Sequence, residues 1–275
     1  MTKAKGSKKK KVITIIAIVV VILALIELVA IGILGGIGPL GFLRGVMQGR
    51  MEGNRSQYSF DLITPLEDSP LKDGKICVLG SSVVYGASSQ QVAVGEFLSK
   101  RFDCDLTKEA VSGTTLVDNG EKSYIQRMLN NIDPNEHFDL FVCQLSTNDA
   151  TQELPLGEIV DSTDLNDFDT STVTGAIQYV ICYARQTWNC PVVFFTGSRY
   201  DSPAYEAMVQ RLMELKDLYE VGVLDLWTSD SFNSISDAQH SLYMDDNIHP
   251  TKAGYRDWWG PEMETQLLDY LAALN

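Results

Sequence analysis

Acyl transfer near neutral pH usually needs an imidazole to carry a proton, and this chain has only three histidines. His137 lies in a polar turn, and His240 follows a polar stretch that offers no partner pattern. His249 differs, because Asp246 stands three residues before it in the stretch Asp246-Asn247-Ile248-His249-Pro250. At this spacing the carboxylate can orient the imidazole and stabilise its protonated form. We therefore predict that His249 is a general base supported by Asp246.

A candidate nucleophile follows one of the apolar runs of the chain. Residues 76–79 read Ile-Cys-Val-Leu and continue into Gly80-Ser81-Ser82, with another glycine at Gly86. Sites in parallel sheets form where the strands end, and this glycine-flanked turn would expose a serine hydroxyl there. A phosphate-binding loop is the alternative interpretation, but no Lys-Ser or Lys-Thr pair ends the segment. The pattern therefore favours nucleophilic catalysis by serine.

The elements that must position these residues alternate between strand and helix. After Gly74, short apolar runs alternate with longer helical patterns, which is typical of a parallel sheet covered by helices on both faces. The predicted strands are residues 76–79, 140–145, 192–196 and 221–226, with a weaker strand at 103–111. Apolar residues recur at helical spacing over 173–184 and 208–219. A final helical stretch is predicted over 251–274, interrupted at Gly260-Pro261. We expect a three-layer α/β/α domain with a five-stranded parallel sheet.

The first 74 residues have a different character. Residues 12–34 carry a single charge, Glu27, and as a helix they would span roughly 34 Å, which crosses a bilayer. This run is longer than the apolar region of a cleaved signal peptide, which favours a retained anchor. Residues 1–11 hold six lysines and no acid, so the positive-inside rule places the N-terminus in the cytoplasm. We expect a basic cytoplasmic tail at 1–11, a single transmembrane helix at 12–34, an extracytoplasmic stalk at 35–74 and one catalytic domain at 75–275. The protein would then be a single-pass protein of the cell membrane with its catalytic domain outside.

Several weaker signals limit the partners and cofactors. Removing the six lysines from the formal net charge of −14 leaves −20 for the rest of the chain, which argues against nucleic acid as a partner. Residues 36–41 match the dinucleotide motif GxGxxG, but no strand precedes them, so we expect no cofactor. The acidic loop of residues 161–169 lacks the spacing and central glycine of an EF-hand, so we expect no metal. Asn54-Arg55-Ser56 matches a glycosylation acceptor.

Five cysteines would lie in an oxidising compartment if the domain is outside the cell. Cys77 and Cys143 fall inside apolar strands and are expected to be small buried hydrophobic residues. Cys182 lies nine residues after Val173, about 180° around a helix from the apolar stripe, and is therefore expected to be exposed. Cys190 is its nearest partner along the chain. We predict a disulfide between Cys182 and Cys190.

Four short blocks, in the same order along the chain, resemble the SGNH (GDSL) hydrolase family from residue 76 to the C-terminus. The blocks are Gly80-Ser81-Ser82, Ala110-Val111-Ser112-Gly113-Thr114-Thr115, Ser146-Thr147-Asn148-Asp149, and the stretch from Asp246 to His249. The resemblance implies a flavodoxin-like fold and a serine esterase in which Ser82 attacks, His249 takes the proton and Asp246 steadies the imidazolium. It also implies an oxyanion hole made by the N–H groups of Ser82 and Gly113 and the side-chain amide of Asn148.

Two positions depart from the family pattern. Ser81 replaces the usual aspartate and Ser146 replaces the usual glycine, and of these Ser146 could narrow the oxyanion pocket. Neither position carries the attack or the proton transfer. The resemblance implies an ester substrate with a small acyl group, for which an acylated glycan is one candidate. Two alternatives remain: an O-acyltransferase acting on envelope polysaccharide with the same residues, and a non-catalytic surface-binding module on the same fold.

Overall fold

The computed structural model describes residues 41–274 and eight isolated positions between residues 14 and 25. The chain divides into two compact units, Met1–Arg50 and Met51–Asn275. In the first unit, helix α2 (Gly41–Arg50) is described in full as backbone. The predicted membrane-spanning segment, residues 12–34, lies mostly outside the described residues. Among the positions that are described, no helix is both long enough and apolar enough to cross a membrane.

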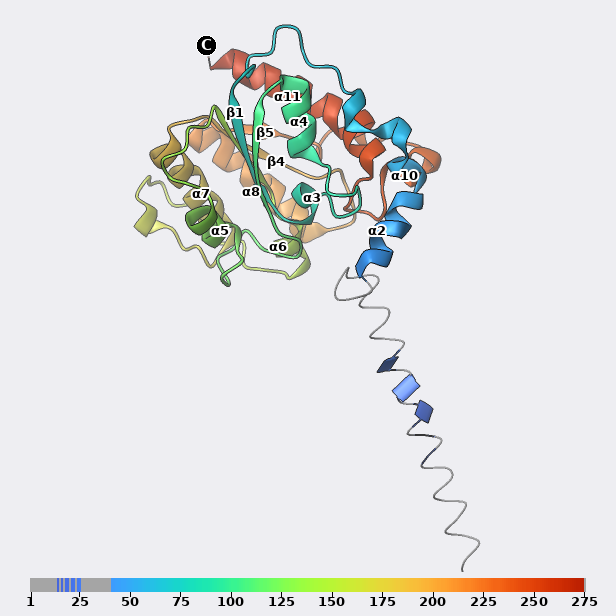
Figure 1. Ribbon diagram of the computed structural model, residues 1–275. Helices are drawn as coiled ribbons and strands as arrows, with labels where there is room; N and C mark the ends of the chain where they lie inside the picture. The colour runs from blue at the N-terminus through green and yellow to red at the C-terminus, as the bar shows by residue number, and fades with distance from the viewer. Residues whose placement is uncertain are drawn as a thin grey trace, which may run out of the picture. The chain divides into compact units, whose positions relative to one another are not determined.

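The second unit is built on a five-stranded parallel sheet, as predicted (Figure 1). Its strands run in the order β2-β1-β3-β4-β5, which is the flavodoxin-like order. The strands are β1 (Lys75–Gly80), β2 (Asp105–Ala110), β3 (Leu140–Gln144), β4 (Val192–Phe195) and β5 (Gly222–Leu224). The register pairs Ile76 with Leu106 on one side and with Leu140 on the other, so β1 lies inside the sheet.

Helices cover both faces of the sheet, because side chains along each strand alternate between two buried clusters. In β1, Cys77 and Leu79 join one cluster, whereas Ile76 and Val78 join the other. Figure 1 shows α5 and α7 on one side of the sheet and α4 and α11 on the other. The α-helices of this unit are α3 (Ser82–Tyr85), α4 (Val94–Phe102), α5 (Tyr124–Asn131), α6 (Thr147–Thr151), α7 (Val173–Trp188), α8 (Pro203–Tyr219), α9 (Asp230–Asn233), α10 (Asp237–Tyr243) and α11 (Gly260–Ala273).

The C-terminal helical stretch is continuous, whereas an interruption was predicted at Gly260-Pro261. A π-helical segment, η6 (Gly254–Trp259), leads directly into α11. Proline has no N–H to donate, and it is tolerated in the first turn of a helix. The wider π turn just before it absorbs the irregularity. The glycine is required for packing, since a Cβ at Gly260 would lie 2.4 Å from the ring of Phe97.

The boundary of the folded unit also differs from the prediction. The unit begins at Met51, so the second half of the predicted stalk, residues 35–74, belongs to the folded domain. Three short 3₁₀ turns, η2 (Glu52–Asn54), η3 (Ser56–Tyr58) and η4 (Phe60–Leu62), precede β1. Phe60 and Leu71 are buried in the core cluster that also contains α4. The stretch shows no periodic pattern because these short turns bury single side chains rather than one face of a regular helix or strand.

The predicted disulfide is wrong in this structure, where Cys182 and Cys190 are both free thiols. Helical periodicity alone predicts that the side of α7 opposite to its apolar stripe is exposed. That side is covered by α8, and Cys182 is only 3% exposed. The hydroxyl of Tyr219, at the end of α8, lies against its thiol. Cys190 is buried as well, and burial raises the pKa of its thiol to about 11.

Candidate active site

Ser82 lies at the point where β1 ends and α3 begins. The backbone N–H of Ser81 donates to the side-chain oxygen of Gln144 over 2.9 Å, which ties this turn to the end of β3. A Cβ at Gly80 would come within 2.3 Å of Val84, so only glycine allows the turn to pass this close to α3. The short helix ends at Gly86 in the left-handed conformation (φ +79°). Its first residue, Ser82, is 7% exposed.

His249 and Asp246 lie in the loop that follows α10. A backbone bridge between Met244 and Pro250 closes this loop. One carboxylate oxygen of Asp246 accepts the backbone N–H groups of Ile248 and His249, at 2.7 and 2.8 Å. The other oxygen lies 2.8 Å from Nδ1 of the same imidazole. Burial opposes the charge on this carboxylate, but the hydrogen bonds from His249 and Ile248 outweigh it and lower the pKa of Asp246 to about 2.

The structure brings the three predicted residues into one hydrogen-bonded series. Nε2 of His249 lies 2.8 Å from Oγ of Ser82, although 167 residues separate them in the sequence. Because an ionised carboxylate can only accept, the hydrogen of the neutral imidazole is on Nδ1, facing Asp246. The lone pair of Nε2 therefore faces the serine hydroxyl. The other two histidines, His137 and His240, are exposed and lie outside this series.

The three predicted oxyanion donors come from the first residue of α3, the loop after β2 and the first turn of α6. The side-chain amide of Asn148 donates to Oγ of Ser81 over 3.1 Å and to the carbonyl of Thr114 over 2.9 Å. These are the immediate neighbours of Ser82 and Gly113, so the amide lies between the two backbone segments. Gly113 has a φ of +80°, and no atom lies within 4 Å of the place where its Cβ would be. This conformation leaves the backbone of Gly113 open on one side.

Two supporting residues were missed by the sequence analysis. The guanidinium of Arg127 donates to the carbonyl of Gly80 over 2.8 Å and to the hydroxyl of Thr114 over 3.1 Å, and its side chain is 3% exposed. The buried carboxylate of Asp149 accepts the backbone N–H groups of Leu116 and Val117. Both hold the loop that contains Gly113. Arg127 could have been noticed, because it places a charge on the buried face of α5.

The segment that precedes the sheet also supports the site. Asn54 is 4% exposed, and its amide donates to the carbonyl of Ser88 over 2.7 Å. Its side-chain oxygen accepts the backbone N–H of Lys252 over 2.9 Å. Ser88 follows α3 and Lys252 follows His249, so one side chain joins the two loops. Ser88 Oγ also donates to the carboxylate of Asp245 over 2.7 Å. Asn54, the first residue of the glycosylation acceptor match, is therefore buried and hydrogen-bonded in the folded domain.

Two hollows adjoin these residues. An open hollow of about 510 Å³ is lined by the loop that contains Gly113, by residues 119–123 before α5 and by Gln152. A small, more enclosed cavity of about 10 Å³ is lined by Val83, Thr147 and Ile248, among others. These three are the chain neighbours of Ser82, Asn148 and His249. Among the residues that the structure describes, no group of histidine, cysteine, aspartate and glutamate side chains could hold a metal ion.

The chain is similar in fold to several solved structures. A protein from Lactobacillus plantarum is 19% identical with a TM-score of 0.56, and the match covers 74% of this chain and 98% of that one. A family two carbohydrate esterase from Clostridium thermocellum, solved with cellohexaose, is 13% identical with a TM-score of 0.52, covering 75% and 67% of the two chains. A carbohydrate esterase family 2 enzyme from Corynascus thermopiles is 14% identical with a TM-score of 0.50, covering 75% and 69%.

No curated protein sequence matches this chain. The profile of the GDSL-like Lipase/Acylhydrolase family matches residues 78–256, from the second half of β1 through the candidate nucleophile to His249 and beyond. The match includes each of the four blocks that resembled the family in the sequence. This chain therefore belongs to the GDSL-like lipase/acylhydrolase family, and it is an esterase of that type.

Proposed function

We propose that the chain hydrolyses carboxylic esters of small acyl groups through a covalent intermediate on Ser82. The observation that carries this proposal is the hydrogen-bonded series from Ser82 through His249 to Asp246, with 2.8 Å at both imidazole nitrogens. A serine hydroxyl is a weak nucleophile unless an adjacent base takes its proton. The imidazole is in position to do so, and the ionised carboxylate stabilises the charge that it then carries.

In the first half of the reaction, Ser82 Oγ forms a bond to the ester carbonyl carbon while its proton moves to Nε2 of His249. The carbonyl oxygen becomes an oxyanion that accepts hydrogen bonds from the N–H groups of Ser82 and Gly113 and from Asn148. The bond from Asn148 to Thr114 keeps the amide oriented, and the bond to the hydroxyl of Ser81 is the one exchanged for the oxyanion. The bond from carbon to the alcohol oxygen then breaks, and His249 gives its proton to that oxygen.

In the second half, a water molecule takes the place of the alcohol. It gives a proton to His249 and attacks the acyl carbon, and the tetrahedral intermediate again places its oxyanion among the same three donors. The bond from carbon to Ser82 Oγ breaks, and His249 returns its proton to the serine. The products are the free acid and the free alcohol, and the enzyme is restored.

The proposed preference for small acyl groups is supported by the small cavity lined by chain neighbours of Ser82, Asn148 and His249. Val83, Thr147 and Ile248 line it, and each adjoins one residue of the reacting centre. Its volume of about 10 Å³ is room for a single water-sized group. A methyl group attached to the carbonyl carbon is of this size, whereas a longer chain requires the walls to move. We therefore propose acetyl esters as the preferred substrates.

We further propose that the domain is anchored in the cell membrane by residues 12–34 with the catalytic unit outside. Six described positions between Ile16 and Leu25 are isoleucine, valine or leucine in helical conformation, each 48 to 58% exposed. Apolar side chains exposed on a helix are stabilised by lipid. The six lysines of residues 1–11 favour the cytoplasmic side. Deleting residues 1–40 should move the protein from the membrane fraction to the soluble fraction; if the deleted protein still sediments with membranes, this anchor is wrong.

The catalytic proposal is tested by labelling with a fluorophosphonate, which reacts with activated serines. We expect one label per chain, mapped to Ser82 by peptide mass spectrometry, and no label after Ser82→Ala or His249→Ala. An unlabelled wild-type protein that is folded would show that the serine is not activated. Product analysis with acetyl esters, with and without a sugar acceptor, separates hydrolysis from acyl transfer to the sugar.

A further inference from the structure

A third hollow lies at the carboxyl edge of the sheet, beyond β4 and β5. It has a volume of about 590 Å³, which is within the range of pockets that bind small molecules. Its walls come from the loop after β4, the loop after β5 and the first turn of α8. Parallel sheets place their ligands at this edge, and the candidate nucleophile lies at the same edge, after β1. We call it the β4–β5 pocket.

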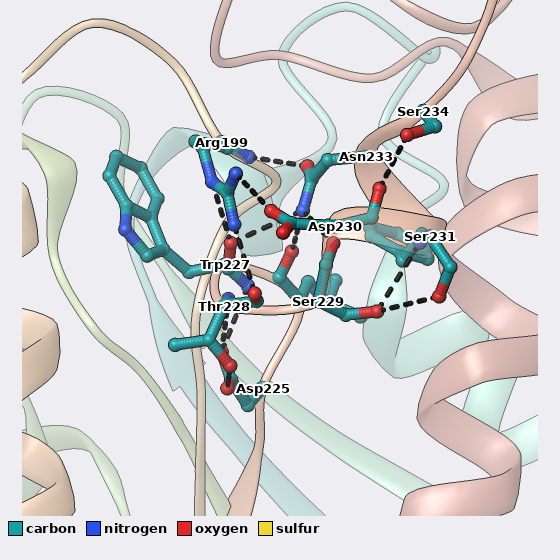
Figure 2. Close-up of polar contacts among 11 residues, drawn as sticks. Arg199, Asp225, Trp227, Thr228, Ser229, Asp230, Ser231, Asn233 and Ser234 are labelled. Atoms are coloured by element: carbon teal, nitrogen blue, oxygen red, sulfur yellow. Dashed lines mark hydrogen bonds and ion pairs between the residues drawn. The ribbon is translucent and has the colours of Figure 1, made fainter.

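Arg199 joins the two loops that form this pocket (Figure 2). Its guanidinium donates to the carbonyls of Trp227 and Thr228, at 3.1 and 2.9 Å, and to the carboxylate of Asp230 at 2.7 Å. Its backbone N–H donates to the side-chain oxygen of Asn233 over 2.8 Å. Four interactions to one residue fix the relative position of the loops. The pocket is therefore formed before any ligand binds, which lowers the entropic cost of binding.

The lining combines aromatic rings with carboxylates that have no protein partner. Tyr200 and Trp227 pack edge to face with ring centroids 5.3 Å apart, and because Trp227 is only 5% exposed, the half-buried ring of Tyr200 is the one open to a ligand. Asp201 and Glu206 are exposed at the opening. Within the described part of the chain, neither carboxylate makes a hydrogen bond or an ion pair. Their acceptor oxygens are available to hydroxyl groups of a ligand.

The β4–β5 pocket is next to the reacting centre through one residue. Tyr200 lines this pocket and also the small cavity that contains Val83 and Ile248. Tyr200 therefore separates the β4–β5 pocket from the space behind the chain neighbours of Ser82 and His249. The side chain of Tyr200 is partly buried, so it forms a wall that both spaces share.

We propose that the β4–β5 pocket binds a neutral sugar unit of an acetylated glycan, adjoining the unit that carries the acetyl group. Ring faces pack on the apolar face of a sugar, and carboxylates accept from its hydroxyls. Three carboxylates, from Asp201, Glu206 and Asp230, line the pocket against one guanidinium, which is paired with Asp230, so a uronate or phosphorylated sugar is repelled. An alkyl chain does not fit, because it would desolvate those carboxylates. This inference rests on the proposed esterase function, and it names the alcohol side of the substrate.

The test compares the double variant Asp201→Asn with Glu206→Gln against the wild type in the full-length chain. We expect kcat/KM for acetylated xylo-oligosaccharides to fall about 10-fold more than kcat/KM for p-nitrophenyl acetate, through a rise in KM. Asp217→Asn is the matched control, since Asp217 is exposed on the same helix α8 but outside the pocket. It should leave both values within twofold of the wild type.

A second measurement keeps sugar binding separate from catalysis. Calorimetry with unacetylated xylohexaose should detect binding to the Ser82→Ala protein, and the double variant should weaken that binding by about 10-fold. The sugar site is overturned if the double variant loses kcat/KM equally for both esters or for neither. It is also overturned if kcat/KM falls for p-nitrophenyl butyrate and not for the acetylated glycan. If the wild type binds the sugar but hydrolyses no ester, the esterase proposal fails while the sugar site stands.

Discussion

Nε2 of His249 lies 2.8 Å from Oγ of Ser82, across 167 residues of sequence. The serine is delivered by the end of β1, and the histidine by a loop that Asp246 closes onto its own backbone. The two loops are tied together by the side chain of Asn54 and by the hydrogen bond from Ser88 to Asp245. These hydrogen bonds hold the loop after Ser82 against the loop that contains His249. They therefore maintain the contact between the two side chains.

Asn148→Ala should lower kcat by about 100- to 1,000-fold, because one of three oxyanion donors is lost. The measurement is hydrolysis of p-nitrophenyl acetate, with circular dichroism to show that the protein is folded. Asn130→Ala is the control, since Asn130 bonds only within α5 and is distant in sequence from the site. Turnover by Asn148→Ala at near the wild-type rate would remove Asn148 from the oxyanion hole.

Asp246→Asn should change the dependence of stability on acid. The pKa of Asp246 is lowered to about 2 in the folded protein, whereas an unfolded aspartate has a pKa of about 3.9. A carboxyl with a lowered folded pKa stabilises the protein above its unfolded pKa, and that contribution is lost as pH falls from about 4 towards 2. The wild type should be more stable than the variant at pH 5, and the difference should shrink towards pH 2. Urea unfolding at each pH measures it. A difference that stays constant would show that Asp246 is not held in its charged form.

Asn54→Ala should destabilise the domain by about 2 to 4 kcal/mol, since it leaves the buried carbonyl of Ser88 and the N–H of Lys252 without this partner. It should also lower kcat about 10-fold at a temperature where the protein is fully folded, with KM unchanged, because the loops carrying Ser82 and His249 lose their link.

Arg55→Ala is the matched control for Asn54, because Arg55 is the next residue and its side chain pairs with the exposed Glu52. It should change stability by less than about 0.5 kcal/mol and leave kcat unaltered. If Asn54→Ala loses stability but keeps the wild-type kcat at low temperature, the segment supports folding without positioning the site.

Ile248→Ala should widen the range of acyl groups that the enzyme accepts. Removing three carbons from the wall of the small cavity gives a longer chain room beside the carbonyl carbon. The ratio of kcat/KM for p-nitrophenyl butyrate to that for p-nitrophenyl acetate should rise about 10-fold, because one or two methylenes in an apolar pocket change kcat/KM by about this factor. An unchanged ratio would place the acyl chain elsewhere.

All five cysteines should titrate as free thiols after unfolding in guanidinium. In the folded protein they should react slowly with Ellman's reagent, because burial raises the pKa of the thiols, for Cys190 to about 11 and for Cys104 to about 12. Mass spectrometry of the alkylated, unreduced protein checks this result. A pair of residues protected from alkylation would restore the disulfide that the structure lacks.

The sequence by itself determined the fold class and the chemical groups of the site. Strands such as β1 and β3 are apolar throughout because both faces are buried, and this pattern is visible without coordinates. Asp246 and His249 are three residues apart, so their contact is local and could be predicted from spacing. The four blocks of the family supplied Ser82, Gly113 and Asn148.

Tertiary structure decided what depends on distant neighbours. Whether Cys182 is exposed depends on α8, which packs on the face of α7 that periodicity leaves polar. The role of Asn54 depends on two loops that follow it by 34 and 198 residues. Arg199 builds a pocket only because β4 and β5 are adjacent in the sheet. Local spacing encodes contacts within one turn of chain, whereas burial and long-range hydrogen bonds exist only after the sheet has brought its ends together.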